Sequence, residues 1–187
     1  MMAAMMLPSA LPMITIYSKI CRQRYETDMP FSAIFSLSYL LVWFAFSWVL
    51  TLLQWRLHEL QWLSRMMENN NSLLAATIFI VAGVYQFTAI KNACLQRCQS
   101  PFGFLLNSWR PGYTGAFKMG AIHGAICVGC CWAQMLLMFA VGVMNITAMI
   151  LITLFILLEK SLPDNNDRIS KFAGGVFFLW GMAWLIW

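Results

Sequence analysis

The sequence predicts an all-α fold, a polytopic bundle of transmembrane helices. Of the 187 residues, 61% are hydrophobic and only 10% are charged, and the mean hydropathy is +0.70. About a quarter of the residues in a soluble domain are charged, so these few charges could not cover a soluble globule of this size. The net charge of +5 sits in short clusters between apolar runs, which is typical of membrane loops and argues against nucleic acid as a partner.

Six apolar stretches are each long enough, or nearly so, to cross the roughly 30 Å hydrocarbon core of a bilayer. The longest, Met119–Leu158, has 40 residues without a formal charge, about 60 Å as a single helix, so it must form two helices. We expect the break at Gly142–Asn145, where a glycine and an asparagine interrupt the aliphatic run. The expected spans, in one integral membrane domain covering residues 1–187, are 1–18, 31–54, 72–90, 118–141, 145–158 and 172–187.

The first span is unusual because Met1 already stands within the apolar helical pattern, so we expect this span to be truncated. Lysine and arginine positions predict the orientation of the bundle. Odd-numbered loops hold ten of these residues and even-numbered loops hold two, and the longest polar stretch, Lys91–Lys118, is expected to be the third loop. Basic loops stay on the cytoplasmic side, so both termini should be extracytoplasmic, in the inner membrane of a bacterial-type cell.

Soft metal ligands are concentrated in one segment of the chain. Five of the six cysteines and one of the two histidines fall within 38 residues. On a helix, the residues from His123 to Cys131 place these ligands within an arc of about 120°. Thiolate and imidazole donors suit copper(I) first and zinc second. The candidate metal ligands are Cys94, Cys98, His123, Cys127, Cys130 and Cys131.

A single helix cannot complete such a site. His123 and Cys127 differ by about 6 Å of helical rise and can share one ion, whereas His123 and Cys131 differ by about 12 Å and cannot. We expect Cys94 and Cys98, one turn apart just beyond the third span, to complete the cytoplasmic half of the column.

The small residues Gly120 and Gly124 stand four apart in the fourth span. Small residues at this spacing let two membrane helices approach closely. We therefore expect this pair to bring the third and fourth spans together.

Several motifs resemble those of a known family. The most specific is Gly120-x-x-His123-Gly124-x-x-Cys127-x-Gly129-Cys130-Cys131-Trp132. The others are Ala4-Met5-Met6-Leu7-Pro8-Ser9, Tyr85-Gln86, Lys91-x-x-Cys94-x-x-x-Cys98-x-Ser100-Pro101, Gly142-Val143-Met144-Asn145 and Glu159-Lys160. With these motifs the chain resembles the predicted metal-binding integral membrane proteins (domain of unknown function 2182). The resemblance implies metal binding and membrane residence, and it leaves the metal and any reaction open.

The leading functional hypothesis is a membrane protein that holds copper(I) in the Cys/His column and Cys94/Cys98, acting as a metal chaperone or conduit. Its expected partners are the lipid bilayer, the metal ion, and a metal-donor or metalloenzyme protein. Two alternatives stay open: a membrane thiol oxidoreductase, and a structural accessory subunit of a membrane complex. Adjacent or one-turn cysteines are poor disulfide partners in a regular helix, which counts against the oxidoreductase. The sequence has no phosphate-binding loop and no paired-carboxylate motif, so we lean against an enzyme.

Overall fold

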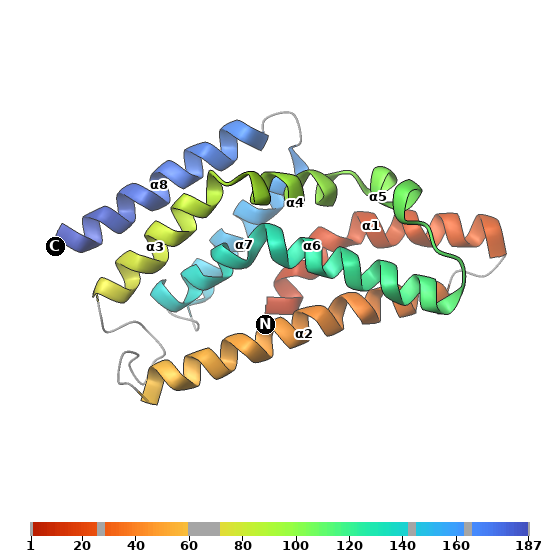
Figure 1. Cartoon of the computed structure of the whole chain (residues 1–187), viewed down its shortest axis with the longest axis horizontal. Helices are drawn as coiled ribbons and strands as arrows, with labels where there is room; N and C mark the ends of the chain where they lie inside the picture. Colours follow the sequence, from red (N-terminus) through yellow and green to blue (C-terminus); the bar gives the residue numbers. More distant parts are fainter. Residues whose placement is uncertain (1, 26–28, 60–71, 142–144, 163–165, 187) are drawn as a thin grey trace. The chain divides into compact units, whose positions relative to one another are not determined.

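The computed structural model describes residues 2–25, 29–59, 72–141, 145–162 and 166–186 (Figure 1). Within these ranges the chain forms eight α-helices and no strand, which confirms the all-α prediction. The helices are α1 (Met2–Tyr25), α2 (Met29–Glu59), α3 (Ser72–Gln86), α4 (Ala89–Gln99), α5 (Pro101–Ser108), α6 (Gly112–Val141), α7 (Ile146–Ser161) and α8 (Asn166–Ile186).

The helices gather into two compact units. The first comprises Met1–Trp48 and Ala93–Cys130, and the second comprises Val49–Asn92 and Cys131–Trp187. Helices α2, α4 and α6 therefore contribute residues to both units. Each unit has its own buried apolar cluster.

The core of the first unit is formed by α1, α2, α5 and α6. Met13, Tyr17 and Cys21 stand four residues apart on one face of α1 and are buried against the other helices. The ring of Tyr17 stacks on that of Phe35 in α2, with the ring centroids 4.8 Å apart. A four-residue repeat of this kind is what places side chains above one another on a helix.

Gly120 brings α2 against α6 within the first unit. A Cβ atom at Gly120 would lie 2.0 Å from Ser38 Oγ and 2.3 Å from the carbonyl oxygen of Phe35. At Gly124 a Cβ atom would lie 3.1 Å from Val42 Cβ, also on α2. Helix α2 therefore packs against Gly120 and Gly124. The expectation that these two glycines face the third span was wrong. Spacing shows that a helix has a narrow face, but it does not identify which partner uses that face.

The second unit is built on close contact between α3 and α8, which run side by side (Figure 1). Glycines make this approach possible: a Cβ atom at Gly83 would lie 2.9 Å from the backbone nitrogen of Phe178. Around this pair, Phe79 and Ala82 of α3 are buried with Ala133 and Leu137 of α6. The result is backbone-to-backbone packing of the kind that apolar helices use when small residues line the contact.

The expected third loop is helical for most of its length. After α3 the chain bends by 66° and continues as α4 to Gln99. Thr88 lies in the bend, where its hydroxyl group donates to the Tyr85 carbonyl at 2.7 Å and accepts the Lys91 backbone N–H at 3.4 Å. Pro101 then opens α5, a position where its missing N–H costs nothing. Most of the polar stretch Lys91–Lys118 is therefore helical, and its place between two membrane spans stays a prediction.

The long apolar run is divided into two helices, α6 ending at Val141 and α7 beginning at Ile146. Asn145 caps α7, because its Oδ1 accepts the backbone N–H of Ala148 at 3.2 Å. The rest of the predicted break, residues 142–144, lies outside the described residues.

Two helices in the described ranges are long and apolar enough to cross a membrane, Pro30–Arg56 and Gly112–Met138. The bent pair Leu73–Gln86 and Ala89–Gln99 would be a third if it forms one broken span. Six crossings, and an orientation with both termini outside, stay predictions.

Candidate metal site

Three of the predicted ligands meet in the first unit. The Sγ atoms of Cys98, Cys127 and Cys130 all lie within 4.8 Å of one another. Cys127 and Cys130 stand three residues apart on the same face of α6, and Cys98 comes from α4. Both α6 thiols are buried, at 1% and 2% exposure, whereas Cys98 is half-buried. We call these residues the three-sulfur cluster.

The size of this cluster suits one soft metal ion. Three sulfur ligands at about 2.3 Å from an ion in a trigonal plane would lie about 4.0 Å from each other. Contraction from the observed spacing by less than about 1 Å would therefore close the site. Thiolate ligands favour copper(I), and a structural zinc ion takes four ligands rather than three.

Hydrogen bonds hold the two buried thiols in place. Cys130 Sγ donates to the carbonyl oxygen of Cys127 at 3.0 Å. The Tyr39 hydroxyl lies 3.3 Å from Cys127 Sγ and also donates to the carbonyl oxygen of Met6 at 3.3 Å. Tyr39 thus links the Met-Met-x-Pro segment of α1 to the cluster, through its hydroxyl group.

His123 stands one turn before Cys127 on α6, outside the three-sulfur cluster. Its imidazole is 3% exposed, and aromatic rings surround it. The ring centroids of Phe35, Tyr39 and Phe104 lie 6.0, 5.8 and 5.6 Å from that of His123. The third member of the cluster, beside Cys98 and Cys127, is therefore the Cys130 thiol. The sequence analysis expected the His123 imidazole in that place.

The remaining two predicted ligands also lie outside the three-sulfur cluster. The sulfur of Cys94 packs over Gly129, where a Cβ atom would lie only 3.1 Å away. Cys131 is buried in the second unit. All six cysteines lie in the described part of the chain, and none of them forms a disulfide bond.

A polar cavity of about 680 Å³ lies within the first unit. Its walls come from α4, α5 and α6 and include Arg97, Asn107 and Ile126. Arg97 precedes Cys98, and Ile126 precedes Cys127. Cys98 and Cys127 thus directly follow residues that line this cavity, but neither of them lines it.

Sequence reasoning missed a buried ionic network in the second unit. Lys91, which it counted among the loop charges, forms an ion pair with Glu159, and both side chains are almost fully buried. Lys91 Nζ also donates to Gln86 Oε1 and, at 3.0 Å, to Ser170 Oγ. Gln134 Nε2 donates to Glu159 Oε2 at 3.0 Å. The available signal was that Lys91 and Glu159 directly adjoin apolar runs, and both occur in the motifs quoted above.

Three thiols that converge inside a helical chain can hold a soft metal ion, and a soft-metal-binding protein is the class that this fold and this site indicate. The family model described as "PpoB2: Copper chaperone" matches residues 1–184. The chain belongs to this copper chaperone family. The match agrees with the metal binding that the sequence resemblance implied, under a different family description. Comparison with curated proteins and with solved structures found no match.

Proposed function

We propose that this protein is a membrane-embedded copper chaperone that carries Cu(I) on Cys98, Cys127 and Cys130. The observation that supports this most is the convergence of the three Sγ atoms within 4.8 Å. Burial of two of the thiols shields the ion from water and oxidants, and thiolate ligands favour the monovalent state. In this proposal copper is the transported ion, so the site must bind it firmly and later release it.

Release begins at Cys98 in this proposal. It is the half-buried ligand of the cluster, so an incoming thiol can replace it while Cys127 and Cys130 keep the ion. Arg97, the residue before Cys98, lines the polar cavity of the first unit, and we propose that a donor or acceptor protein, such as a copper enzyme under assembly, approaches Cys98 from this side. A three-coordinate ion accepts a fourth ligand readily, which makes such an exchange fast.

Movement of the ion along the bundle is the finer part of the proposal. Cys94 precedes Cys98 by one turn of α4, and His123 precedes Cys127 by one turn of α6. Each is about 6 Å of rise from a cluster ligand, so each is a candidate for a neighbouring, weaker site. Successive weak sites are what conduction of an ion through a membrane requires.

Cu(I) titration of the detergent-purified protein, against a chromophoric Cu(I) chelator and without oxygen, tests the three-sulfur cluster. We expect one tightly bound ion per chain. Serine at Cys98, Cys127 or Cys130 should weaken binding by more than the 10–100-fold that loss of a supporting residue costs. His123→Ala should cost less, because its ring lies outside the cluster.

Cys21→Ser is the matched control, since Cys21 is fully buried in the same unit within an apolar cluster. It should leave the affinity for Cu(I) unchanged. Undiminished copper binding in all three cluster variants would contradict the proposal, as would an equal loss in the Cys21 variant. X-ray absorption that reports nitrogen and oxygen rather than sulfur around the copper would also contradict it.

A further inference from the structure

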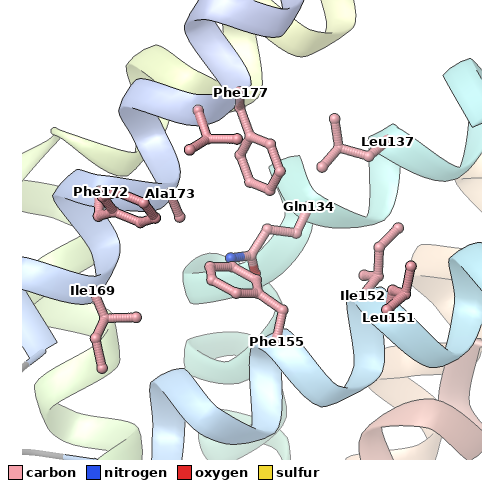
Figure 2. Close-up of a pocket in the computed structure, with 10 residues that line it drawn as sticks. Gln134, Leu137, Leu151, Ile152, Phe155, Ile169, Phe172, Ala173 and Phe177 are labelled. Carbon is pink, nitrogen blue, oxygen red and sulfur yellow. The ribbon is translucent and has the colours of Figure 1, made fainter.

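Two cavities of the described chain differ in the chemistry of their walls. The cavity of about 440 Å³ in the second unit is lined by apolar side chains except for Gln134, which is only 2% exposed (Figure 2). Lipid chains can fill such a cavity. The cavity of the first unit is lined by a guanidinium, two amides and two hydroxyl groups, from Arg97, Gln96, Asn107, Ser100 and Ser108. These groups require a polar partner, which a lipid chain cannot supply.

The polar cavity lies at the depth of the middle of a helix that crosses the membrane in the proposed function. The apolar stretch of α6, Gly112–Met138, has its midpoint at Ala125. Ile122 and Ile126 line the cavity from α6, within about 5 Å of helical rise from this midpoint. Arg97 lines the same cavity from α4, which continues α3 as a broken span. The cavity is therefore near the centre of the hydrocarbon core.

The polar wall of this cavity is open to the surroundings of the chain, because Gln96, Arg97, Ser100 and Asn107 are all exposed. An arginine that faces lipid at the bilayer centre is costly, so charged side chains at this depth face protein or water and mark functional sites. The interface is about 15 Å away, half the thickness of the hydrocarbon core, and the Arg97 side chain cannot extend that far. This face of the first unit therefore needs a polar cover.

This chain offers no carboxylate that could neutralise Arg97 at this depth. The described part of the first unit contains no aspartate or glutamate. All acidic residues of the sequence lie outside the six expected spans: Glu26, Asp28, Glu59, Glu68, Glu159, Asp164 and Asp167. A second copy placed on the same face would set Arg97 against Arg97, and like charges in contact oppose association. The counter-charge must therefore come from a different protein.

We propose that this face docks a transmembrane helix of a partner protein, and that this helix carries an aspartate or glutamate near the bilayer centre. The carboxylate pairs with the Arg97 guanidinium, whose planar fork suits it. Gln96 and Asn107 form hydrogen bonds with polar groups of the same helix, as membrane helices do across their contacts. The inference rests on the membrane residence in the proposed function. It makes the copper donor or acceptor an integral membrane protein.

Synthetic transmembrane peptides test the proposal. Three leucine-rich helices are identical except for a central glutamate, glutamine or lysine, and each carries a fluorescent acceptor. The full chain carries the donor in phosphatidylcholine vesicles, and energy transfer gives the association constant. We expect the glutamate peptide to associate at least about tenfold more tightly than the glutamine peptide, as a charged hydrogen bond provides. The lysine peptide should show only background transfer.

Variants of Arg97 locate the contact. Arg97→Gln should remove the preference for glutamate over glutamine. Arg97→Glu should reverse the order, so that the lysine peptide associates most tightly. Both changes are at an exposed position, so we expect the chain to fold. Lys118→Gln is the matched control, because Lys118 is an exposed cation of the same unit outside the cavity, and it should keep the glutamate preference.

Equal association of the three peptides would overturn the proposal and would mean that water covers the face. A glutamate preference that survives Arg97→Gln, or that Lys118→Gln reduces as much, would also overturn it. Analytical ultracentrifugation in detergent tests a second copy as the cover. A dimer of the parent chain that Arg97→Glu dissociates would replace the partner helix with that copy.

A Cu(I) titration of the same samples keeps this proposal apart from the proposed function. Intact Cu(I) binding without a glutamate preference contradicts only the partner helix. A glutamate preference without Cu(I) binding supports the partner helix and contradicts only the three-sulfur cluster.

Discussion

At the scale of single residues, the cluster depends on one hydroxyl group beside one thiol. The Tyr39 hydroxyl lies 3.3 Å from Cys127 Sγ. Metal binding removes the proton from the thiol, and the single Tyr39 hydroxyl proton would then turn from the Met6 carbonyl oxygen to Cys127 Sγ. A donor of this kind stabilises the charge on a metal-bound sulfur and holds it in position.

Tyr39→Phe should therefore weaken Cu(I) binding by about tenfold, at the lower end of the range for supporting residues. The same chelator titration measures it. Tyr17→Phe removes another buried tyrosine hydroxyl of the same unit, away from the cluster thiols, and serves as the control. If both variants bind Cu(I) as the parent does, Tyr39 has only a packing role.

At the scale of helices, the contact of α2 with α6 has no room for a methyl group at Gly120. A Cβ atom there would meet a backbone carbonyl at 2.3 Å, and backbone cannot rotate away as a side chain can. We expect Gly120→Ala to lower the free energy of unfolding by about 1–3 kcal/mol, which is typical of overpacking. Chemical unfolding in detergent, followed by tryptophan fluorescence, measures the change.

Gly175→Ala is the matched control. Gly175 also lies inside a helix, but nothing lies within 4 Å of the added atom. Alanine is the better helix former, so this variant should be unchanged or more stable by up to about 1 kcal/mol. A Gly120 variant that is as stable as the Gly175 variant would refute the close contact.

The buried ion pair joins α4 to α7, with Gln86 and Ser170 adding α3 and α8. Glu159→Gln leaves the Lys91 ammonium buried without its counter-charge. We expect a loss of about 3–5 kcal/mol in the free energy of unfolding, the usual cost of breaking such a pair on one side. The double change Lys91→Met with Glu159→Gln should recover part of that loss, because no isolated charge is then left. If the double variant has the same free energy of unfolding as Glu159→Gln alone, Lys91 and Glu159 are not energetically coupled.

At the scale of the whole molecule, the open question is the orientation of the chain in a bilayer. Lys91 is buried, so it no longer counts toward the basic residues of the third loop. The remaining lysines and arginines of the odd-numbered loops still outnumber those of the even-numbered loops. We therefore expect a cysteine at the exposed Ile146 to react with an impermeant thiol reagent from outside the cell. A cysteine at the exposed Pro111 should react only from the cytoplasmic side. The parent protein supplies the background from its own thiols, and the reverse pattern would invert the orientation.

The sequence by itself determined the helical class and the presence of soft ligands, because both depend on local quantities. Long apolar runs define helices through composition and length, and Cys127 and Cys130 share a face of α6 through helical spacing alone. Whether the whole column binds metal, and how many times the chain crosses a membrane, stay predictions. The break between α6 and α7 could also be anticipated, since a 40-residue apolar run is too long for one span.

Only the tertiary structure decided which residues distant in the chain come together. It selected Cys98 and Cys130 as the companions of Cys127, and it placed α2 rather than the third span against Gly120. It also paired Lys91 with Glu159, 68 residues away, in the buried interior. From the sequence alone we expected only uncharged side chains there. The physical reason is that periodicity describes the face that a helix presents. The partner of that face depends on how side chains fill space and neutralise charge across helices, which no local pattern contains.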